Sequence, residues 1–137
     1  MSDVTIEYET IRGDKDFSEK VAPDRLLDRI DDIKHRFQDG LQAPYGVDVV
    51  NDKGDRMTVG FDESEGFLML QPGSDQEWTQ YSLGDVRRDG YKAFYLPQWS
   101  ELSSKYMVPT PRLREAVQHW AETGELGKQV RWTTESY

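Results

Sequence analysis

The sequence contains no cysteine among its 137 residues. Disulfide bonds, thiolate metal sites and cysteine nucleophiles are therefore excluded. Histidine occurs only twice, and no apolar run approaches the roughly 20 residues that a membrane-spanning helix needs. The first residues also lack a basic segment followed by an apolar one, so we expect no signal peptide and a cytoplasmic protein.

Motifs of the common enzyme classes are missing as well. No glycine-rich loop suited to a phosphate is present, and no serine occupies a nucleophile elbow. Carboxylates are paired at Asp31 and Asp32 and in the turn at residues 62–65, but these positions indicate a polar helix face and a turn. General acid–base catalysis needs one carboxyl of such a pair to be buried. We therefore expect no catalytic residue, no cofactor and no metal ligand.

One arrangement keeps an enzymatic hypothesis open. His119 follows Glu115 by four residues and precedes Glu122 by three, so the three side chains lie near one another on a predicted helix. A carboxylate beside a histidine can bind a metal or support a general base. No further ligand stands at a recognised spacing, so we interpret the three as surface residues. A small cytoplasmic enzyme of unknown type that uses His119 with Glu115 is retained as an alternative.

The chain is strongly acidic, with a formal net charge of -9. Residues 1–65 contain 17 acidic and 9 basic side chains, whereas residues 66–137 contain 9 and 8. An acidic domain repels nucleic acid, because binding to nucleic acid depends on neutralising phosphates. It attracts a basic protein surface, since complementary charge accelerates association. The same charge is also consistent with a plain solvated surface, and both interpretations stay open.

Hydrophobic periodicity predicts a single α+β domain over residues 1–137. Alternating apolar residues predict strands near residues 3–12, 45–50, 56–61, 67–70, 77–83, 92–97 and 129–133. Two amphipathic helices are expected over residues 23–38 and 111–123, with connections at 13–19 and 98–107 and a hairpin turn at Asp89-Gly90. This order indicates a largely antiparallel sheet of about six to seven strands with two helices packed on one face. The other face then has no cover and carries aromatic side chains.

Residues 108–132 form the most complete local unit. Thr110 is suited to cap the helix N-terminus, Pro111 to the first helical position, and Gly124 to the left-handed residue that ends the helix. The apolar residues at helical spacing are Leu113, Ala116, Val117, Trp120 and Ala121. A strand containing Val130 and Trp132 follows. We expect this unit to complete the fold, with its apolar side chains in the core rather than at a contact surface.

Aromatic residues are more numerous than a small core requires, with four Trp, seven Tyr and five Phe. Exposed Trp and Tyr rings are typical anchors of protein interfaces, and acidic side chains at the rim suit a basic partner. We predict that the carboxylates meet basic groups and that the rings fill apolar pockets of a partner. The candidate contacts are Asp62, Glu63, Glu65, Trp78, Tyr81, Asp85, Tyr91, Trp99 and Tyr106.

Several short motifs occur together between Met57 and Trp132. They are Leu68-Met69-Leu70, Tyr81-Ser82-Leu83-Gly84-Asp85, Val108-Pro109, Ala116-Val117, Trp120, Thr123-Gly124 and Val130-Arg131-Trp132. In combination they resemble the immunity-protein family numbered one of bacterial polymorphic toxin systems. The resemblance implies a small non-enzymatic α+β antitoxin encoded beside a toxin gene. It also implies a toxin partner that is often similar to the zinc-dependent nucleic-acid deaminases.

The resemblance and the charge lead to one hypothesis. A toxin that acts on DNA or RNA, whether a deaminase or a nuclease, needs a basic channel for its substrate. An acidic protein with exposed rings is suited to block that cleft by direct binding. We therefore predict a toxin partner and no binding to nucleic acid or membrane. Besides the enzyme, a second alternative is an interaction or assembly module that oligomerises through the aromatic face of the sheet.

Overall fold

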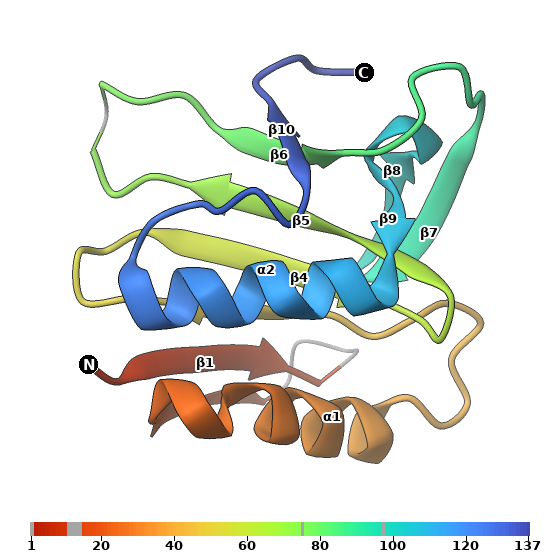
Figure 1. Ribbon diagram of the computed structural model, residues 1–137. Helices are drawn as coiled ribbons and strands as arrows, with labels where there is room; N and C mark the ends of the chain where they lie inside the picture. The colour runs from red at the N-terminus through yellow and green to blue at the C-terminus, as the bar shows by residue number, and fades with distance from the viewer. Residues whose placement is uncertain (1, 11–14, 75, 97) are drawn as a thin grey trace.

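The computed structural model describes residues 2–10, 15–74, 76–96 and 98–137 (Figure 1). Within them, eight strands form one sheet in the order β10-β6-β5-β4-β3-β1-β2, with β9 beside β5, while β7 and β8 form a separate two-stranded ribbon. The strands are β1 Val4–Glu9, β2 Asp16–Val21, β3 Val47–Val50, β4 Arg56–Phe61, β5 Glu65–Gln71, β6 Gln80–Leu83, β7 Tyr91–Tyr95, β8 Trp99–Ser103, β9 Val108–Pro109 and β10 Arg131–Thr133. The helices are α1 Leu26–Phe37 and α2 Thr110–Thr123, with short 3-10 turns at η1 Pro23–Arg25 and η2 Ser104–Tyr106.

Both helices lie on the same side of the large sheet, α1 beside β1 and α2 across β4 and β5 (Figure 1). Every pairing between the named strands is antiparallel. The predicted α+β class, the largely antiparallel sheet and the two helices on one face are thereby confirmed. The central strands β3 to β6 follow one another in space as they do in sequence, as expected for a meander.

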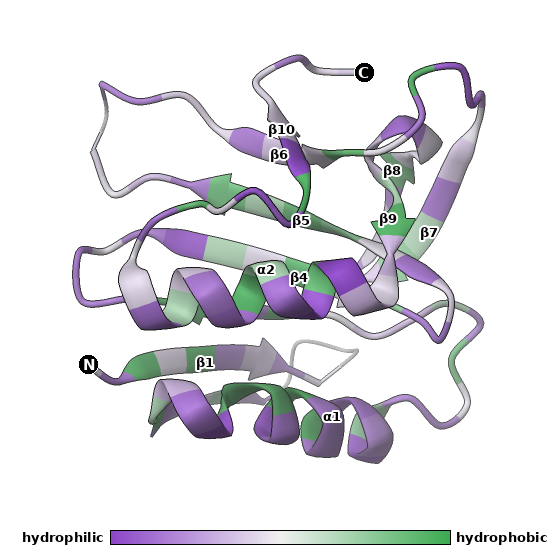
Figure 2. Ribbon diagram, viewed as in Figure 1, coloured by the Kyte–Doolittle hydropathy of each residue, from purple (hydrophilic) through white to green (hydrophobic). Residues whose placement is uncertain are grey.

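A continuous apolar core lies between the helices and the sheet. Each helix turns a stripe of side chains at helical spacing toward the strands, and none of these side chains is more than 2% exposed: Leu26, Ile30, Ile33, Leu113, Val117 and Trp120. The sheet contributes alternate residues of β3, β4 and β5, including Val49, Met57 and Leu68. Figure 2 shows the same division, with hydrophobic colour where the helices meet the sheet and hydrophilic colour outside.

The helix α2 ends as predicted but begins one residue earlier. Gly124 has a φ of 76° and its amide donates to the Trp120 carbonyl at 2.7 Å, so the predicted left-handed end is confirmed. The prediction that Thr110 caps the N-terminus is wrong, because Thr110 is itself the first helical residue. Its hydroxyl instead donates to the Asp62 carbonyl at 2.8 Å, which ties the start of α2 to the turn between β4 and β5.

The opposite face of the sheet is partly covered, which the sequence did not predict. The ribbon of β7 and β8 packs on it through a second cluster of buried residues, namely Phe67, Phe94, Tyr106 and Met107. The rings of Phe67 and Phe94 lie 4.9 Å apart beside Gly60, where a Cβ atom would lie 2.6 Å from Phe67 and 2.9 Å from Phe94. Glycine is therefore required at this position, because the ribbon could not otherwise seat against the sheet.

Two predicted connections are strands. Residues 98–107 were expected to be a loop, but they contain β8 and η2. The turn at Asp89-Gly90 does not close a hairpin, because β6 pairs with β5 and β10 whereas β7 pairs only with β8. The expected connection at 13–19 is also wrong from Asp16 onward, since β2 pairs with β1 at the edge of the sheet. Parts of the predicted strands at 3–12 and 92–97 and of the predicted connection at 13–19 fall on residues 11–14 and 97, which lie outside the described residues.

Candidate protein-binding surface

The turn between β4 and β5 carries three of the predicted acidic contacts. The Asp62 carboxylate accepts hydrogen bonds from the amides of Ser64 at 2.8 Å and Glu65 at 3.0 Å, and it forms an ion pair with Lys92 of the ribbon. Desolvation acts to raise the pKa of Asp62, but the hydrogen bonds from Lys92 and the two amides outweigh it and hold the pKa well below its usual range. Asp62 therefore holds the ribbon to the sheet.

Most of the predicted acidic contacts are neutralised within the molecule. Arg88 donates to both carboxylate oxygens of Glu65, at 2.9 and 3.2 Å. Asp85 pairs in the same way with its neighbour Arg87, at 3.1 Å. Glu63 is exposed and makes no ion pair within the described part of the chain. Of the four predicted carboxylates, Glu63 is thus the one whose charge is fully available to a partner.

The predicted aromatic contacts divide into exposed and buried rings. Trp78 is 78% exposed, Tyr91 68% and Trp99 49%. Tyr106 is only 4% exposed, so the prediction that its ring is an exposed anchor is wrong. Its ring stacks on the half-buried ring of Tyr81 at 4.4 Å. Three rings therefore remain available to a partner, one on the β5–β6 loop and two on the ribbon.

The two exposed ribbon rings belong to one face. Phe94 and Lys92 of β7 point toward the sheet, so the alternation of a strand places Tyr91 and Tyr95 on the other side, where Tyr91 is exposed and Tyr95 is half-buried against the main core. Trp99 of β8 lies directly opposite Tyr95, and their rings meet edge to face at 5.4 Å. We call these three side chains, Tyr91, Tyr95 and Trp99, the ribbon patch. Tyr95 was not among the predicted contacts, although its position four residues after Tyr91 was a usable signal.

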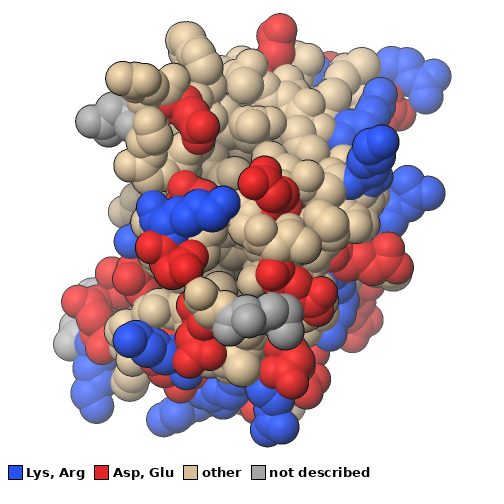
Figure 3. Space-filling view, turned by 60° about the vertical axis from the view of Figure 1, so that its left-hand side comes forward, with Lys and Arg blue, Asp and Glu red and all other residues tan. Residues whose placement is uncertain are grey.

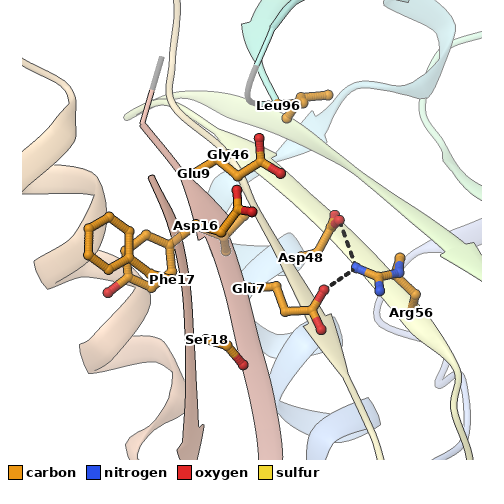
Figure 4. A pocket seen from close by; sticks show the side chains of 11 residues that line it. Glu7, Glu9, Asp16, Phe17, Ser18, Gly46, Asp48, Arg56 and Leu96 are labelled. Atoms are coloured by element: carbon orange, nitrogen blue, oxygen red, sulfur yellow. Dashed lines mark hydrogen bonds and ion pairs between the residues drawn. The ribbon is translucent and has the colours of Figure 1, made fainter. Parts of the chain in front are cut away.

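A groove of about 290 Å³ lies where the ribbon ends and the sheet is uncovered (Figure 4). Leu96 closes one side, and the floor is the outer face of β1, β2 and β3 beside Gly46. Its polar lining consists of Glu7, Glu9, Asp16, Ser18, Asp48 and Arg56. None of these residues was predicted as a contact. Only part of the signal was present, because Glu7 and Glu9 occupy alternate positions of one predicted strand, whereas Asp16 and Asp48 come from two other strands.

The charges in this groove are only partly balanced. Arg56 donates to Glu7 at 2.8 Å and to Asp48 at 3.0 Å, and the Thr58 hydroxyl also donates to Asp48, at 2.7 Å. Figure 3 shows acidic and basic side chains crowded over the lower part of the molecule, around the N-terminal strands and α1, whereas the middle of the upper part is mostly uncharged and basic side chains line its right edge. The charged residues, which are unevenly divided along the sequence, are therefore also unevenly distributed over the surface of the molecule.

The residues of the enzymatic alternative form no chemical centre. His119 and Glu115 line a wide, open depression beside α2, and neither side chain makes a hydrogen bond or ion pair within the described residues. In the same part of the chain, no group of three or more His, Asp or Glu side chains is placed to hold a metal ion. Nor does any helix described there have the length and apolar character of a membrane span.

Comparison with known proteins places this fold in a family. The family model described as Immunity protein Imm1 matches residues 23–134. The match includes both helices and the strands from β3 to β10, so it reaches well beyond the region from Met57 in which the motifs were found. It confirms the resemblance that those motifs carried. No curated protein matches the chain.

Proposed function

The chain belongs to the Imm1 immunity protein family, and from this premise we propose that it neutralises a cognate toxin by direct protein–protein binding. Family membership supports the immunity role. The proposed mechanism is physical blockage, with no reaction catalysed by the chain itself. The partner is a toxin domain that acts on nucleic acid, as a deaminase or a nuclease, and whose basic cleft this acidic protein covers.

The observation that carries this proposal is the ribbon patch. Two of its rings, Tyr91 and Trp99, remain 68% and 49% exposed although the opposite face of the ribbon packs on the sheet through the buried Phe94. Rings of this kind on two paired strands lose little conformational freedom on binding, and such rings are common hot spots. The patch therefore supplies the apolar centre of an interface.

The charge supports a basic partner surface. The net charge of -9 would draw a positively charged cleft toward the molecule and speed encounter. A cleft shaped for phosphates is the surface that carries such charge in a toxin acting on DNA or RNA. Glu63 remains a candidate rim contact because its carboxylate has no ion pair in the described part of the chain.

The test uses the toxin domain encoded by the gene adjoining that of this chain. We expect a one-to-one complex with nanomolar or tighter affinity, together with loss of the toxin's activity on its nucleic-acid substrate. Affinity is expected to fall as salt rises from about 50 to about 500 mM, because screening weakens attraction between the two charged surfaces. A toxin that remains active in the presence of excess chain, or an affinity that does not change with salt, contradicts the proposal.

A further inference from the structure

One strand of the ribbon has an open edge. In the described residues, β8 pairs only with β7, and the Ser104 amide just beyond β8 donates to the Gly90 carbonyl at 2.9 Å. Hydrogen-bonded residues alternate along an antiparallel ladder, so counting back by twos from Ser104 gives the residues of β8 that bond to β7. Trp99 and Glu101 are not among them. Their N–H and C=O groups therefore point outward along the open edge of the ribbon.

At the opposite edge of the ribbon, outward backbone groups of the same kind are bonded to a neighbouring segment. Tyr95 of β7 follows the same alternation: its amide donates to the Pro44 carbonyl at 2.9 Å, and its carbonyl accepts from the Gly46 amide at 2.8 Å. The ribbon is also held on the sheet by the buried Phe94 and by the ion pair of Lys92. The open edge of β8 is therefore presented at a fixed position.

Both edges of the large sheet are protected against an added strand. The strand β10 is only three residues long, and β2 turns the charged Glu19 inward, opposite the buried Ile6, where Arg29 pairs with it at 2.7 Å. Very short edge strands and inward-pointing charges both discourage pairing with another chain. The strand β8 has neither, because it is five residues long and turns Ser100 and Leu102 toward the sheet. Of these three edges, β8 is the one suited to an added strand.

The side chains at this edge favour a basic partner. Glu101, at the centre of β8, is exposed, and Trp99 on the same outer face is 49% exposed. In a paired strand, the residue opposite Glu101 projects from this face as well, and a positive charge there stabilises the pair. A second copy of the chain carries the same net charge of -9 and is repelled. The edge therefore suits a strand of a different protein that carries a basic residue.

We propose that an extended segment of the toxin adds to β8 as a third strand of the ribbon, with a lysine or arginine opposite Glu101 and an apolar residue opposite Trp99. This inference rests on the proposed function and specifies how the partner is held. Backbone hydrogen bonds to the two outward-facing residues supply affinity, and the side chains opposite them supply specificity. The added strand lies beside the ribbon patch, so that the rings and the edge form one interface.

The first experiment measures amide hydrogen exchange residue by residue in the isotopically labelled full chain, free and bound to the toxin domain of the adjoining gene. In the free chain, the amides of Trp99 and Glu101 should exchange quickly, although those of Ser100 and Leu102 are protected. Binding should slow the two outward amides by about a hundredfold or more, a larger gain than at the two inward ones. A complex that leaves the exchange of Trp99 and Glu101 unchanged overturns the inference. Slow exchange of both in a free chain that has the mass of two copies overturns it in favour of self-pairing.

A matched pair of variants separates the backbone contact from the side chain. Glu101→Pro removes an outward N–H that β7 does not use, and proline is tolerated at such positions of an edge strand. Glu101→Ala removes the carboxylate but keeps the amide. We expect the alanine variant to bind the toxin domain about fivefold more weakly than the native chain, and the proline variant about fiftyfold more weakly. Equal losses in the two variants overturn the inference. Continued protection of the Ser100 and Leu102 amides verifies that the ribbon is intact, and if the proline variant loses it, exchange in the native complex decides.

A charge reversal tests the residue opposite Glu101. Glu101→Lys keeps the backbone amide and is expected to weaken toxin binding about tenfold, because it places two positive charges across the strands. Glu115→Lys makes the same change of charge at an exposed position of α2 and is expected to weaken binding less than about twofold. Equal losses reduce the effect to net charge and contradict a basic residue opposite Glu101.

The outcomes separate this inference from the proposed function. If the native chain neutralises the toxin and Glu101→Pro neutralises it equally well, with the ribbon intact in both, strand addition fails and the antitoxin role stands. If the native chain forms no complex with the toxin domain, the proposed function fails, and strand addition fails with it.

Discussion

The two faces of the large sheet are built for different tasks. Under the helices, the strands from β1 to β5 turn apolar side chains toward a core in which Trp120 of α2 is fully buried. On the other face, apolar packing is confined to the area beneath the ribbon, and the remainder carries charged side chains and the groove. The difference is consistent with a helix side that supplies stability, and it supports our proposal that the ribbon side, which leaves rings and carboxylates exposed, supplies recognition.

The largest expected effect is on the helix side. Trp120→Ala removes a fully buried indole from the centre of the core, so we expect the free energy of unfolding to fall by about 3–5 kcal/mol. Chemical denaturation followed by circular dichroism measures the loss. A variant that keeps its stability but no longer binds the toxin would reverse the assignment of the two faces.

The next effect concerns the attachment of the ribbon. Phe94→Ala removes the ring that packs on Phe67, and we expect a loss of about 3 kcal/mol together with faster amide hydrogen exchange across β7 and β8. Phe94→Leu retains apolar volume and is expected to lose less than half as much. Unchanged exchange in the ribbon of the alanine variant would show that Phe94 does not hold it in place.

A third change acts on recognition without affecting the core. Trp99→Ala is expected to leave the free energy of unfolding within about 1 kcal/mol of the native value, yet to weaken toxin binding by about 2 kcal/mol or more. Trp78→Ala is the matched comparison, because it removes the same kind of ring from the β5–β6 loop. A greater loss of affinity with Trp78→Ala than with Trp99→Ala would place the centre of the interface on that loop.

The smallest expected effect is a change in the free energy of unfolding that comes from Lys34, at the rim of the helix side. Burial lowers the pKa of Lys34 to about 8, beneath the 10.5 of an unperturbed lysine, and its ammonium lies 5.3 Å from the Phe61 ring centroid. Between pH 8 and pH 10.5, Lys34 is mostly neutral in the folded chain but mostly protonated in the unfolded chain. The unfolded chain therefore binds more protons, so Lys34 makes the free energy of unfolding rise with pH over this range.

Lys34→Met tests that sign. The variant keeps the apolar stem and removes the partly desolvated charge, so we expect it to be more stable than the native chain at pH 7 by roughly 1 kcal/mol. The advantage should shrink as the pH approaches 10.5. Thermal unfolding of both proteins across this range measures it, and an advantage that grows with pH would contradict the account.

Residue spacing within short stretches of sequence was sufficient to predict the elements in which the periodicity is strong. Both helices, the meander and the left-handed Gly124 follow from spacing within short windows. The strand β2 was missed because Glu19 interrupts its apolar side, and only the pairing of Glu19 with Arg29 at 2.7 Å explains that interruption. The strand β8 was missed because Trp99 faces outward and Leu102 inward, so the two give no alternation on one face.

The sequence predicted the types of residue at the candidate site, aromatic and acidic, but not which of them are exposed. The exposed Trp78, Tyr91 and Trp99 were named from composition, but no local signal separates them from Tyr106. The hydroxyl of Tyr106 donates to the Glu135 carbonyl at 2.9 Å, a contact that depends on the chain returning from 29 residues away. The groove was missed for the same reason, since its carboxylates come from three strands that become neighbours only in the folded sheet.

Amide hydrogen exchange of the native chain, free and bound to the toxin domain of the adjoining gene, tests the division between the two faces most directly. Binding should protect the amides of β7 and β8, while the outer surfaces of α1 and α2 exchange as they do in the free protein. Protection confined to the helices, with the ribbon unchanged, would contradict the account.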